Sequence, residues 1–327
     1  MIFFKLRFLL LAYLYFVSTS CFSNEIKVAV LKFGSVNWEI DVIKYHNLDK
    51  KYGIKIKRIE MTNKDATAIA FLSKSVDTFV SDWIWVNKQR NQGKLFTFSP
   101  FSTASGSLLV KGDSEIKSLR DLQDKRIGVA GGALDKSWLF FRAYSIKEIG
   151  KDPISFFKPS YAAPPLINGL IVNNELDGAF NYWNYAARLE SKGYKSILNV
   201  DDILPSLGIK GELPLIGYVF RDKFVKQNIE SLSNFLKASS AARNILDNSD
   251  KEWVRIKKLT GAKTDLMLNK IKNSFRKGIP KSSNESMLTT MQIAFKVLEK
   301  IGGKKLVGSS KKLQDGIILK NDKVIND

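Results

Sequence analysis

Tryptophan, aspartate and tyrosine residues follow two short apolar segments that lie one hundred residues apart. The first segment, 76–85, reads VDTFVSDWIW, and the second, 176–185, reads LDGAFNYWNY. In each segment, Asp precedes an apolar run typical of a buried strand, and aromatic and polar side chains follow that run. Aromatic rings stack on planar or cationic groups, and a carboxylate accepts hydrogen bonds from an amino group. These residue types therefore favour non-covalent binding of a small nitrogen-containing molecule.

The two segments read as copies of one structural unit. Four pairs of positions match: Asp77 with Asp177, Asp82 with Tyr182, Trp83 with Trp183 and Trp85 with Tyr185. In an open α/β sheet, ligands bind beyond the carboxyl ends of the strands. Two such strand ends predict two lobes that face one cleft. A chance match between degenerate αβ units is the alternative.

Four of the six tryptophans fall just after an expected strand or in the first turn of the next helix. They are Trp38, Trp83, Trp138 and Trp183. Indoles that face each other across a cleft would sandwich a planar or cationic group, at about 0.5–2 kcal/mol each. Each could instead pack in a core, as we expect for Trp85 and Trp253.

Polar candidates for the same site occur near the strand ends. Asp82 and Asp135 could each cap a helix or contact the solute. The turn at Gly131, with Lys136 and Ser137, could receive an anion at a helix N-terminus. Secondary donors are expected at Asn37, Ser105, Asn181 and Tyr182. The two acidic positions favour a neutral or cationic ring over a strong anion.

Alternating strand and helix patterns predict an α/β protein with two doubly wound, mostly parallel lobes. The first β-α-β-α-β unit has strands at 26–32, 54–59 and 78–80 and helices at 39–46 and 66–73. The second has strands at 126–129, at 154–158 and in the repeated segment, and helices at 137–144 and 164–173. Helices are expected at 223–247, 251–259, 264–275 and 284–301. The Lys-rich tail after Gly302 is expected to be loosely held.

Two crossings between the lobes are expected, near Val110 and near Pro214, and would form a hinge. Residues 24–110 and 214–327 would then form the first lobe, and 111–213 the second. A chain of 327 residues is long enough for two such units.

The N-terminal residues have the pattern of a secretory signal peptide. Lys5 and Arg7 precede an apolar run at 8–17 and a mostly small, polar stretch at 18–23. We expect cleavage before Asn24 and export. An uncleaved anchor and a lipid anchor on Cys21 are the alternatives. Because Cys21 is the only cysteine, cleavage would leave no disulfide, thiolate nucleophile or cysteine metal site.

The net charge and the sequence motifs limit the classes of function that we expect for this protein. The net charge is +20, but the lysines are scattered along expected helices and turns. They indicate solvated faces, with weak attraction to an anionic membrane surface, and we expect no nucleic-acid partner. The single histidine, His46, cannot form an imidazole cluster. Phosphate-loop, nucleophile-elbow, zinc-helix and calcium-loop patterns are absent from the sequence, so we expect no catalytic residue, cofactor or metal.

Several features together resemble the periplasmic substrate-binding proteins of ABC importers, within the nitrate/sulfonate/taurine and thiamine-pyrimidine-precursor branch. They are the stretch SLRDLQDKRIGVAGG at 118–132, the loop ASGS at 104–107, the repeated helix-turn-Asp units, the signal peptide and the double crossing. The resemblance covers residues 25–300. It implies a two-lobed type II periplasmic binding protein fold with a helical C-terminal part.

The resemblance also implies a function. A monomeric, non-enzymatic protein would capture a small solute between closing lobes and deliver it to an ABC permease in the inner membrane. A pyrimidine such as a thiamine precursor is the first candidate solute, and a sulfonate or another small oxyanion is the second. A secreted enzyme like the pyrimidine synthases is an alternative, which the missing cysteine motif and single His46 disfavour. An exported structural protein, with its cleft filled by indoles, is a third.

Overall fold

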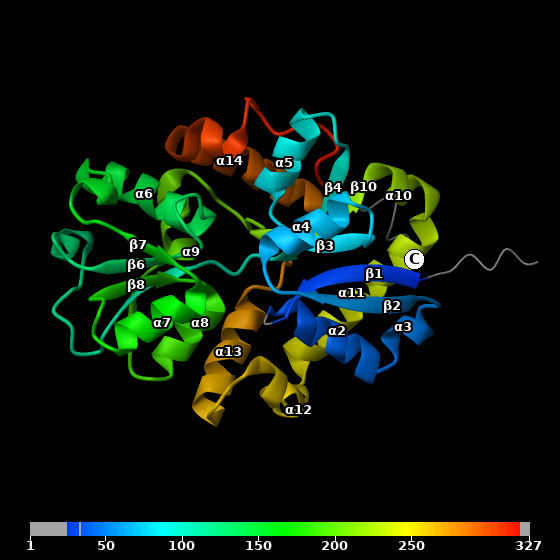
Figure 1. Cartoon of the computed structure of the whole chain (residues 1–327), viewed down its shortest axis with the longest axis horizontal. Helices are drawn as coiled ribbons and strands as arrows, with labels where there is room; N and C mark the ends of the chain where they lie inside the picture. The colour runs from blue at the N-terminus through cyan, green and yellow to red at the C-terminus, as the bar shows by residue number, and fades with distance from the viewer. Residues whose placement is uncertain (1–24, 33, 321–327) are drawn as a thin grey trace, which may run out of the picture.

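The computed structural model describes residues 25–32 and 34–320, so the expected signal peptide lies outside the described residues. Two five-stranded sheets form two lobes that lie side by side, and helices cover both faces of each sheet (Figure 1). None of the helices in the described part of the chain has the length and apolar character needed to span a membrane.

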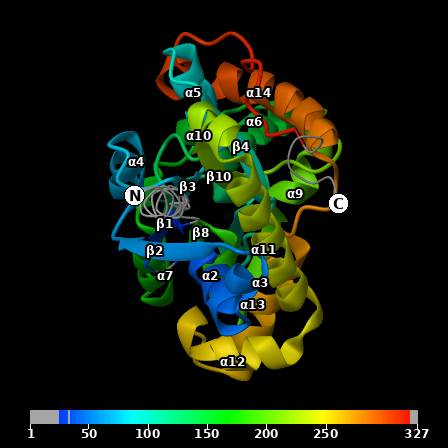
Figure 2. The ribbon, with the colours of Figure 1, turned by 90° about the vertical axis from the view of Figure 1, so that its right-hand side faces the viewer.

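The first lobe contains a sheet in the order β2-β1-β3-β10-β4. Its strands are β1 (Glu25–Leu31), β2 (Lys55–Met61), β3 (Thr78–Ser81), β4 (Phe96–Ser102) and β10 (Ile216–Arg221). Strands β1, β2 and β3 are parallel, and β10 runs antiparallel to both of its neighbours. In this lobe α2 and α11 pack against each other (Figure 2).

The second lobe repeats this arrangement with the order β7-β6-β8-β5-β9. Its strands are β5 (Ser107–Val110), β6 (Ile127–Ala130), β7 (Ser160–Ala162), β8 (Gly178–Asn181) and β9 (Lys195–Asn199). Here β5 is the antiparallel strand between β8 and β9. The shared topology confirms the predicted two-lobed fold of doubly wound, mostly parallel sheets.

The helices connect the strands and form most of the C-terminal part. They are α2 (Val36–Tyr45), α3 (Leu48–Lys51), α4 (Lys64–Leu72), α5 (Trp83–Asn91), α6 (Lys136–Ile149), α7 (Pro164–Val172), α8 (Trp183–Glu190), α9 (Val200–Ile203), α10 (Asp222–Gln227), α11 (Ile229–Asn248), α12 (Asp250–Thr260), α13 (Asp265–Lys277) and α14 (Asn284–Val307). Three short 3₁₀ turns are η1 (Leu119–Leu122), η2 (Pro153–Ser155) and η3 (Pro205–Leu207).

Two C-terminal helices join the lobes. Helix α13 packs on α8 of the second lobe, and α14 packs on both α5 and α6. One hydrophobic cluster therefore contains residues of both sheets, among them Phe79 and Val129. The apolar residues of these helices recur at spacings of three and four, so they share one face of each helix. That face is buried against both lobes.

Three local predictions need correction. Strand β5 belongs to the second sheet, so the first crossing lies at 103–106, before the expected position near Val110. No strand forms at 154–158, because Pro153 begins η2, and β7 follows at 160–162. The tail is not loose at 317–319, since Phe98 exchanges backbone hydrogen bonds with Ile317 and Leu319 at the edge of β4.

Candidate ligand-binding site

The repeated segments form the same local structure in both lobes. Lys74 and Asn174 take left-handed conformations at matching turns, with φ of 64° and 61°. Asp77 Oδ2 accepts a 2.8 Å hydrogen bond from the backbone N–H of Lys27, and Asp177 Oδ2 accepts one of the same length from Arg126. These aspartates join neighbouring strands. They place Asp82 and Tyr182 at corresponding carboxyl ends of β3 and β8.

Asp82 and Asp135 both cap helices. Asp82 Oδ1 accepts a hydrogen bond from Trp85 N at 2.9 Å, and Asp135 Oδ1 accepts one from Trp138 N at 3.3 Å. The capping alternative is thus correct for both residues. A cap uses one carboxylate oxygen, so the second oxygen of each side chain can contact another group.

A charged cluster connects the lobes at these helix starts. We define it as Lys64 and Asp82 of the first lobe with Asp135, Lys136 and Tyr182 of the second. Lys136 Nζ donates to Asp82 Oδ2 at 2.6 Å, and the two side chains are 20% and 19% exposed. Lys64 Nζ lies 3.5 Å from the Tyr182 hydroxyl and 5.2 Å from the centre of its ring. Side chains of the two lobes therefore contact each other at the carboxyl ends of β3 and β8.

The pKa shifts in this cluster follow from burial and from the alternating charges. Burial opposes ionisation of Asp82, but the charge and hydrogen bond of Lys136 outweigh it and lower the pKa of Asp82. Burial also disfavours charged Lys136, yet Asp82 and Asp135 raise its pKa overall. For Lys64, burial and repulsion by Lys136 lower the pKa. Burial and the nearby Asp135 carboxylate raise the pKa of Tyr182, which therefore stays a neutral hydrogen-bond donor.

Gly131 makes room for the tyrosine of this cluster. Its φ is +83°, and a Cβ at this position would lie 2.0 Å from the Tyr182 hydroxyl and 3.1 Å from Asp135 Oδ2. The hydroxyl of Ser137, the second residue of α6, is already engaged, because it accepts a hydrogen bond from the backbone N–H of Gly106 at 3.2 Å. The turn therefore positions Tyr182, while Ser137 joins α6 to the crossing segment.

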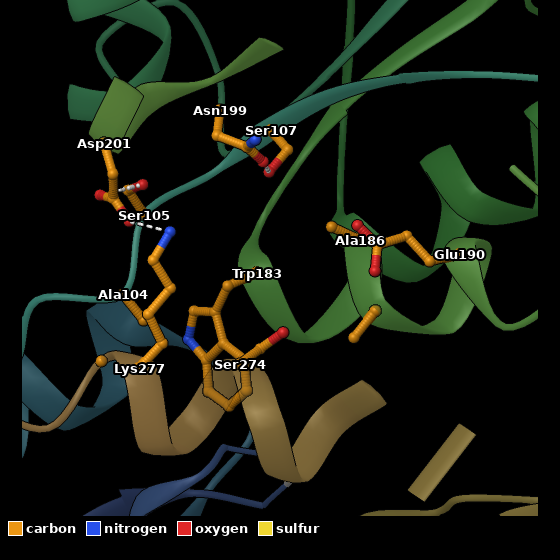
Figure 3. Close-up of a pocket in the computed structure, with 12 residues that line it drawn as sticks. Ala104, Ser105, Ser107, Trp183, Ala186, Glu190, Asn199, Asp201, Ser274 and Lys277 are labelled. Carbon is orange, nitrogen blue, oxygen red and sulfur yellow. Dashed lines mark hydrogen bonds and ion pairs between the residues drawn. The ribbon is translucent and has the colours of Figure 1, made fainter. Parts of the chain in front are cut away.

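A small pocket lies between the lobes beside Trp183 (Figure 3). Its volume is about 80 Å³, which is below the 300 Å³ or so of a pocket for a drug-sized ligand. Its polar lining residues are Ser105, Ser107, Glu190, Asn199, Asp201, Ser274 and Lys277. Ser105 Oγ donates to Asp201 Oδ1 at 2.6 Å, and Lys277 Nζ lies 3.6 Å from Asp201 Oδ2.

Most polar residues of this pocket were missed by the sequence analysis. Only Ser105 and Trp183 were expected at the site. Asn199 ends β9, an edge strand for which the sequence shows no repeat, and Asp201 lies two residues beyond it. Lys277 lies on a C-terminal helix of the other lobe. The position of Asn199 at the end of a predicted strand was the one feature of the sequence that could have pointed to this pocket.

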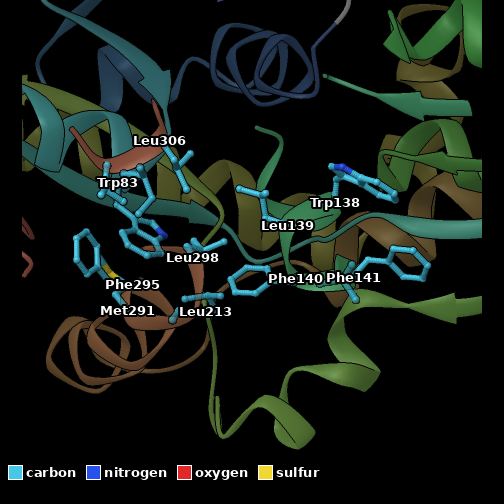
Figure 4. Packing of buried hydrophobic residues seen from close by; sticks show 14 of the residues in the cluster. Trp83, Trp138, Leu139, Phe140, Phe141, Leu213, Met291, Phe295, Leu298 and Leu306 are labelled. Carbon is cyan, nitrogen blue, oxygen red and sulfur yellow. The ribbon is translucent and has the colours of Figure 1, made fainter. Parts of the chain in front are cut away.

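The tryptophans do not all face a common gap. Trp83 and Trp138 are 1% and 0% exposed and lie in the same hydrophobic cluster (Figure 4). Trp83 Nε1 donates to the backbone oxygen of Pro214 at 2.7 Å, which fixes the ring inward. Of the four candidate tryptophans, Trp183 alone is partly exposed, and its ring meets that of Trp38 edge to face at 6.0 Å. The expected sandwich of indoles is therefore corrected to one inter-lobe contact beside the pocket.

Two expected donors hold loops instead of pointing into open space. Asn37 is 1% exposed and donates to the backbone oxygens of Leu31 and Lys32. Asn181, also 1% exposed, donates to Pro164 O and Asn168 Oδ1. Both amides fix the carboxyl ends of strands, so their part in the site is to position the loops around it.

The single histidine lies away from the inter-lobe contacts. His46 follows the last residue of α2, at the opposite end of the helix from Trp38, and its Nε2 is 3.1 Å from Glu252. Within the described ranges, no group of three or more histidine, cysteine, aspartate and glutamate side chains is arranged to hold a metal ion.

Comparison with known proteins assigns the fold. No protein-family model and no curated protein matches the chain. Solved structures do match, and they give the chain the fold of periplasmic binding proteins of ABC importers.

Three of these solved structures illustrate the match. The aliphatic sulphonate binding protein SsuA from Escherichia coli is 15% identical with a TM-score of 0.69, over 87% of this chain and 94% of that one. The alkanesulfonate-binding protein SsuA from Xanthomonas axonopodis pv. citri, bound to MOPS, is 13% identical with a TM-score of 0.69, over 91% and 98%. A Candida albicans protein with the generic periplasmic binding protein fold is 13% identical with a TM-score of 0.56, over 90% and 96%.

Proposed function

We propose that the protein is the solute-binding component of an ABC importer. It captures a small solute between its two lobes and delivers it to a permease in the inner membrane. The observation that carries the proposal is the meeting of both lobes at the carboxyl ends of their strands, where Asp82 of one lobe contacts Lys136 of the other. In α/β sheets this edge is where ligands bind.

The first candidate ligand is a small planar nitrogenous solute, such as a thiamine-pyrimidine precursor. Trp183 supplies an aromatic wall to the pocket, and Asp201 and Glu190 supply carboxylates. An aromatic face attracts planar or cationic groups, and carboxylates accept hydrogen bonds from amino groups. These features support the nitrogenous ligand.

The second candidate is a sulfonate or another small oxyanion. Lys136 and Lys64 lie in the charged cluster next to a turn at Gly131 and the start of α6. Ammonium groups and helix N-termini attract anions. The folds of the two SsuA proteins, whose names state sulfonate binding, support this candidate as well.

The proposal also includes export to the periplasm and transport without catalysis. The pattern of residues 1–23 supports a cleaved signal peptide and a periplasmic location, and we expect a monomer. A secreted pyrimidine-synthase-like enzyme remains the alternative of another class. The pairing of His46 with Glu252 disfavours that alternative, because it leaves the one imidazole away from the cleft.

A binding experiment tests the function. The chain without residues 1–23 is titrated with aminopyrimidines and with alkanesulfonates, followed by calorimetry and by tryptophan fluorescence. We expect saturable one-to-one binding of one class, and the same class in the mass spectrum of whatever copurifies. Absence of binding across both classes, or turnover of a bound pyrimidine, would contradict the proposal.

A further inference from the structure

The first lobe contains a pocket of its own, separate from the pocket between the lobes. Its volume is about 410 Å³, which falls within the range of roughly 300–1,000 Å³ that is typical of small-molecule sites. Helix α11 forms one side of it, and β4, the loop between α13 and α14, and the segment around Leu319 form the rest. The two pockets share no lining residue. A molecule bound here would therefore lie outside the cleft.

The loop between α13 and α14 is held in place by both segments that cross between the lobes. Glu212, before β10, accepts hydrogen bonds through Oε2 from the backbone N–H groups of Lys281 and Ser282, at 2.8 and 2.6 Å. At the other end of the loop, the backbone oxygen of Gly278 accepts one from Thr103 N at 2.9 Å. One wall of the pocket is thus fixed by the fold, as in most small-molecule sites, which are largely formed before the ligand binds.

Part of the pocket is apolar. The apolar lining residues are Pro100, Leu236, Ile279, Pro280, Met287 and Leu319. Leu236, Met287 and Leu319 are buried, so they form the apolar wall. An alkyl chain that leaves water for this wall should gain up to about fourfold in affinity for each buried methylene.

The polar part contains more cationic than anionic groups. Arg243 and Lys281 are the cations, and Asp247 is the single carboxylate among the described lining residues. Neither Asp247 nor Lys281 forms an ion pair with another described residue. The lining therefore has a net positive charge of one.

Arg243 is weakly satisfied by its neighbours, although its side chain is only 17% exposed. Its Nη1 lies 3.4 Å from the backbone oxygens of Pro100 and Phe101, which is longer than an ordinary N–H···O hydrogen bond. Its Nε lies 3.8 Å from Glu39 Oε2. Burial raises the pKa of Glu39, so this carboxyl is a weak counter-charge. A bound anion would supply the partner that the guanidinium lacks.

We propose that this pocket binds a small monocarboxylate with a short apolar chain. The carboxylate pairs with Arg243, because a guanidinium matches a carboxylate through two parallel hydrogen bonds, and Lys281 adds a second positive charge. The chain lies on the apolar wall. Asp247 disfavours a second negative charge on the ligand. This site is additional to solute capture between the lobes and does not depend on it.

Matched six-carbon probes test the proposal by calorimetry on the chain without residues 1–23. They are hexanoate, hexan-1-ol, hexylamine and hexanedioate, with butanoate as a shorter monocarboxylate. We expect one-to-one binding of hexanoate, about tenfold tighter or more than hexan-1-ol, hexylamine and hexanedioate, and severalfold tighter than butanoate. Failure of hexanoate to bind, or equal binding of hexan-1-ol or hexanedioate, would overturn the proposal.

Variants locate the bound hexanoate. Ser240 lines the pocket at an exposed position of α11, so Ser240→Trp should fill the pocket and abolish binding without unfolding the protein. Ile229→Trp is the matched control, because it places the same ring at an exposed position of α11 outside the lining, and hexanoate affinity should stay unchanged. Arg243→Met should lower the affinity for hexanoate to that for hexan-1-ol. Unchanged hexanoate binding in Ser240→Trp would place the carboxylate elsewhere and overturn the proposal, even if Arg243→Met does not fold.

Discussion

Asp82 Oδ2 and Lys136 Nζ belong to different lobes and lie 2.6 Å apart. Asp82 is fixed at the N-terminus of α5, and Lys136 is the first residue of α6. Separation of the lobes would break this ion pair. Their ion pair therefore favours closed lobes in the absence of solute, in addition to the packing of α13 and α14 on both lobes.

The first prediction concerns closure and pH. The pKa of Asp82 is below its ordinary 3.8, because the attraction of Lys136 outweighs the effect of burial. The contribution of the ion pair is thus present above pH 3.8 and is lost as the pH falls through the lower folded-state value. We expect the radius of gyration from small-angle scattering to stay constant from pH 8 to pH 5 and to rise only below about pH 4.

Asp82→Asn separates this effect from general acid unfolding. The variant should show the larger radius at neutral pH and low salt, with its circular dichroism unchanged. If Asp82→Asn and the unmodified protein scatter identically at pH 7, the ion pair does not control closure.

The second prediction concerns the turn at Gly131. In Gly131→Ala the new methyl group would overlap the Tyr182 hydroxyl, and a positive φ would disfavour it further. Gly132→Ala is a close control, because φ is +93° there but nothing lies within 4 Å of the added Cβ. Both variants should lose about 1–2 kcal/mol of stability from backbone strain. Only Gly131→Ala should weaken solute binding, by about tenfold or more on calorimetry. Equal affinity in the two variants would contradict a role for Tyr182.

Much of the fold could be predicted from local patterns. The alternation of strands and helices and the match between the segments at 76–85 and 176–185 predict two equivalent lobes, because both copies have an aspartate before the strand and a tryptophan at the start of the next helix. The position of β5 was harder to predict. Its sequence, SLLV, is buried and apolar in either lobe, and only pairing with β8 and β9 assigns it to the second sheet.

The site was less accessible from sequence. Spacing predicts that Trp83 and Trp183 start equivalent helices, but it does not show which ring turns inward. For Trp83 this depends on the Pro214 carbonyl, which is distant in the chain and accepts a hydrogen bond from the indole. Lys64 and Lys277 could not be singled out either, because lysines are common in this chain and only tertiary packing brings these two to the cleft.

The third prediction concerns the different roles of Trp83 and Trp183. Trp183→Phe should remove most of the fluorescence change on solute binding and cost about 1 kcal/mol of stability, since the ring is only partly buried. Trp83→Phe should keep the fluorescence change but cost about 2–3 kcal/mol, because it loses buried contacts and the hydrogen bond to Pro214. Urea unfolding and solute titration of both variants provide the measurements. A larger loss of solute affinity in Trp83→Phe than in Trp183→Phe would contradict this prediction, because solute binding would then depend on the buried ring.

The last prediction concerns a buried carboxyl group in the first lobe. Glu39 is fully buried, accepts a 2.9 Å hydrogen bond from the Tyr218 hydroxyl and lies 3.8 Å from Arg243. Burial raises its pKa above the ordinary 4.5, although Arg243 and Tyr218 act in the opposite direction. Above pH 4.5 the unfolded chain therefore releases this proton while the folded protein retains it.

Retention of this proton makes the free energy of unfolding fall as the pH rises from 4.5 to the folded-state pKa of Glu39. Glu39→Gln keeps the acceptor for Tyr218 but has no proton to lose, so it should lack this decrease. Its stability relative to the unmodified protein should then grow above pH 4.5, by about 1.4 kcal/mol for each unit by which the pKa is raised. Urea unfolding at pH 4.5, 6 and 8 measures the difference. Glu230→Gln, at an exposed position of α11, should show no such trend. A constant difference between Glu39→Gln and the unmodified protein would mean that Glu39 is ionised in the fold, with Arg243 as its counter-ion.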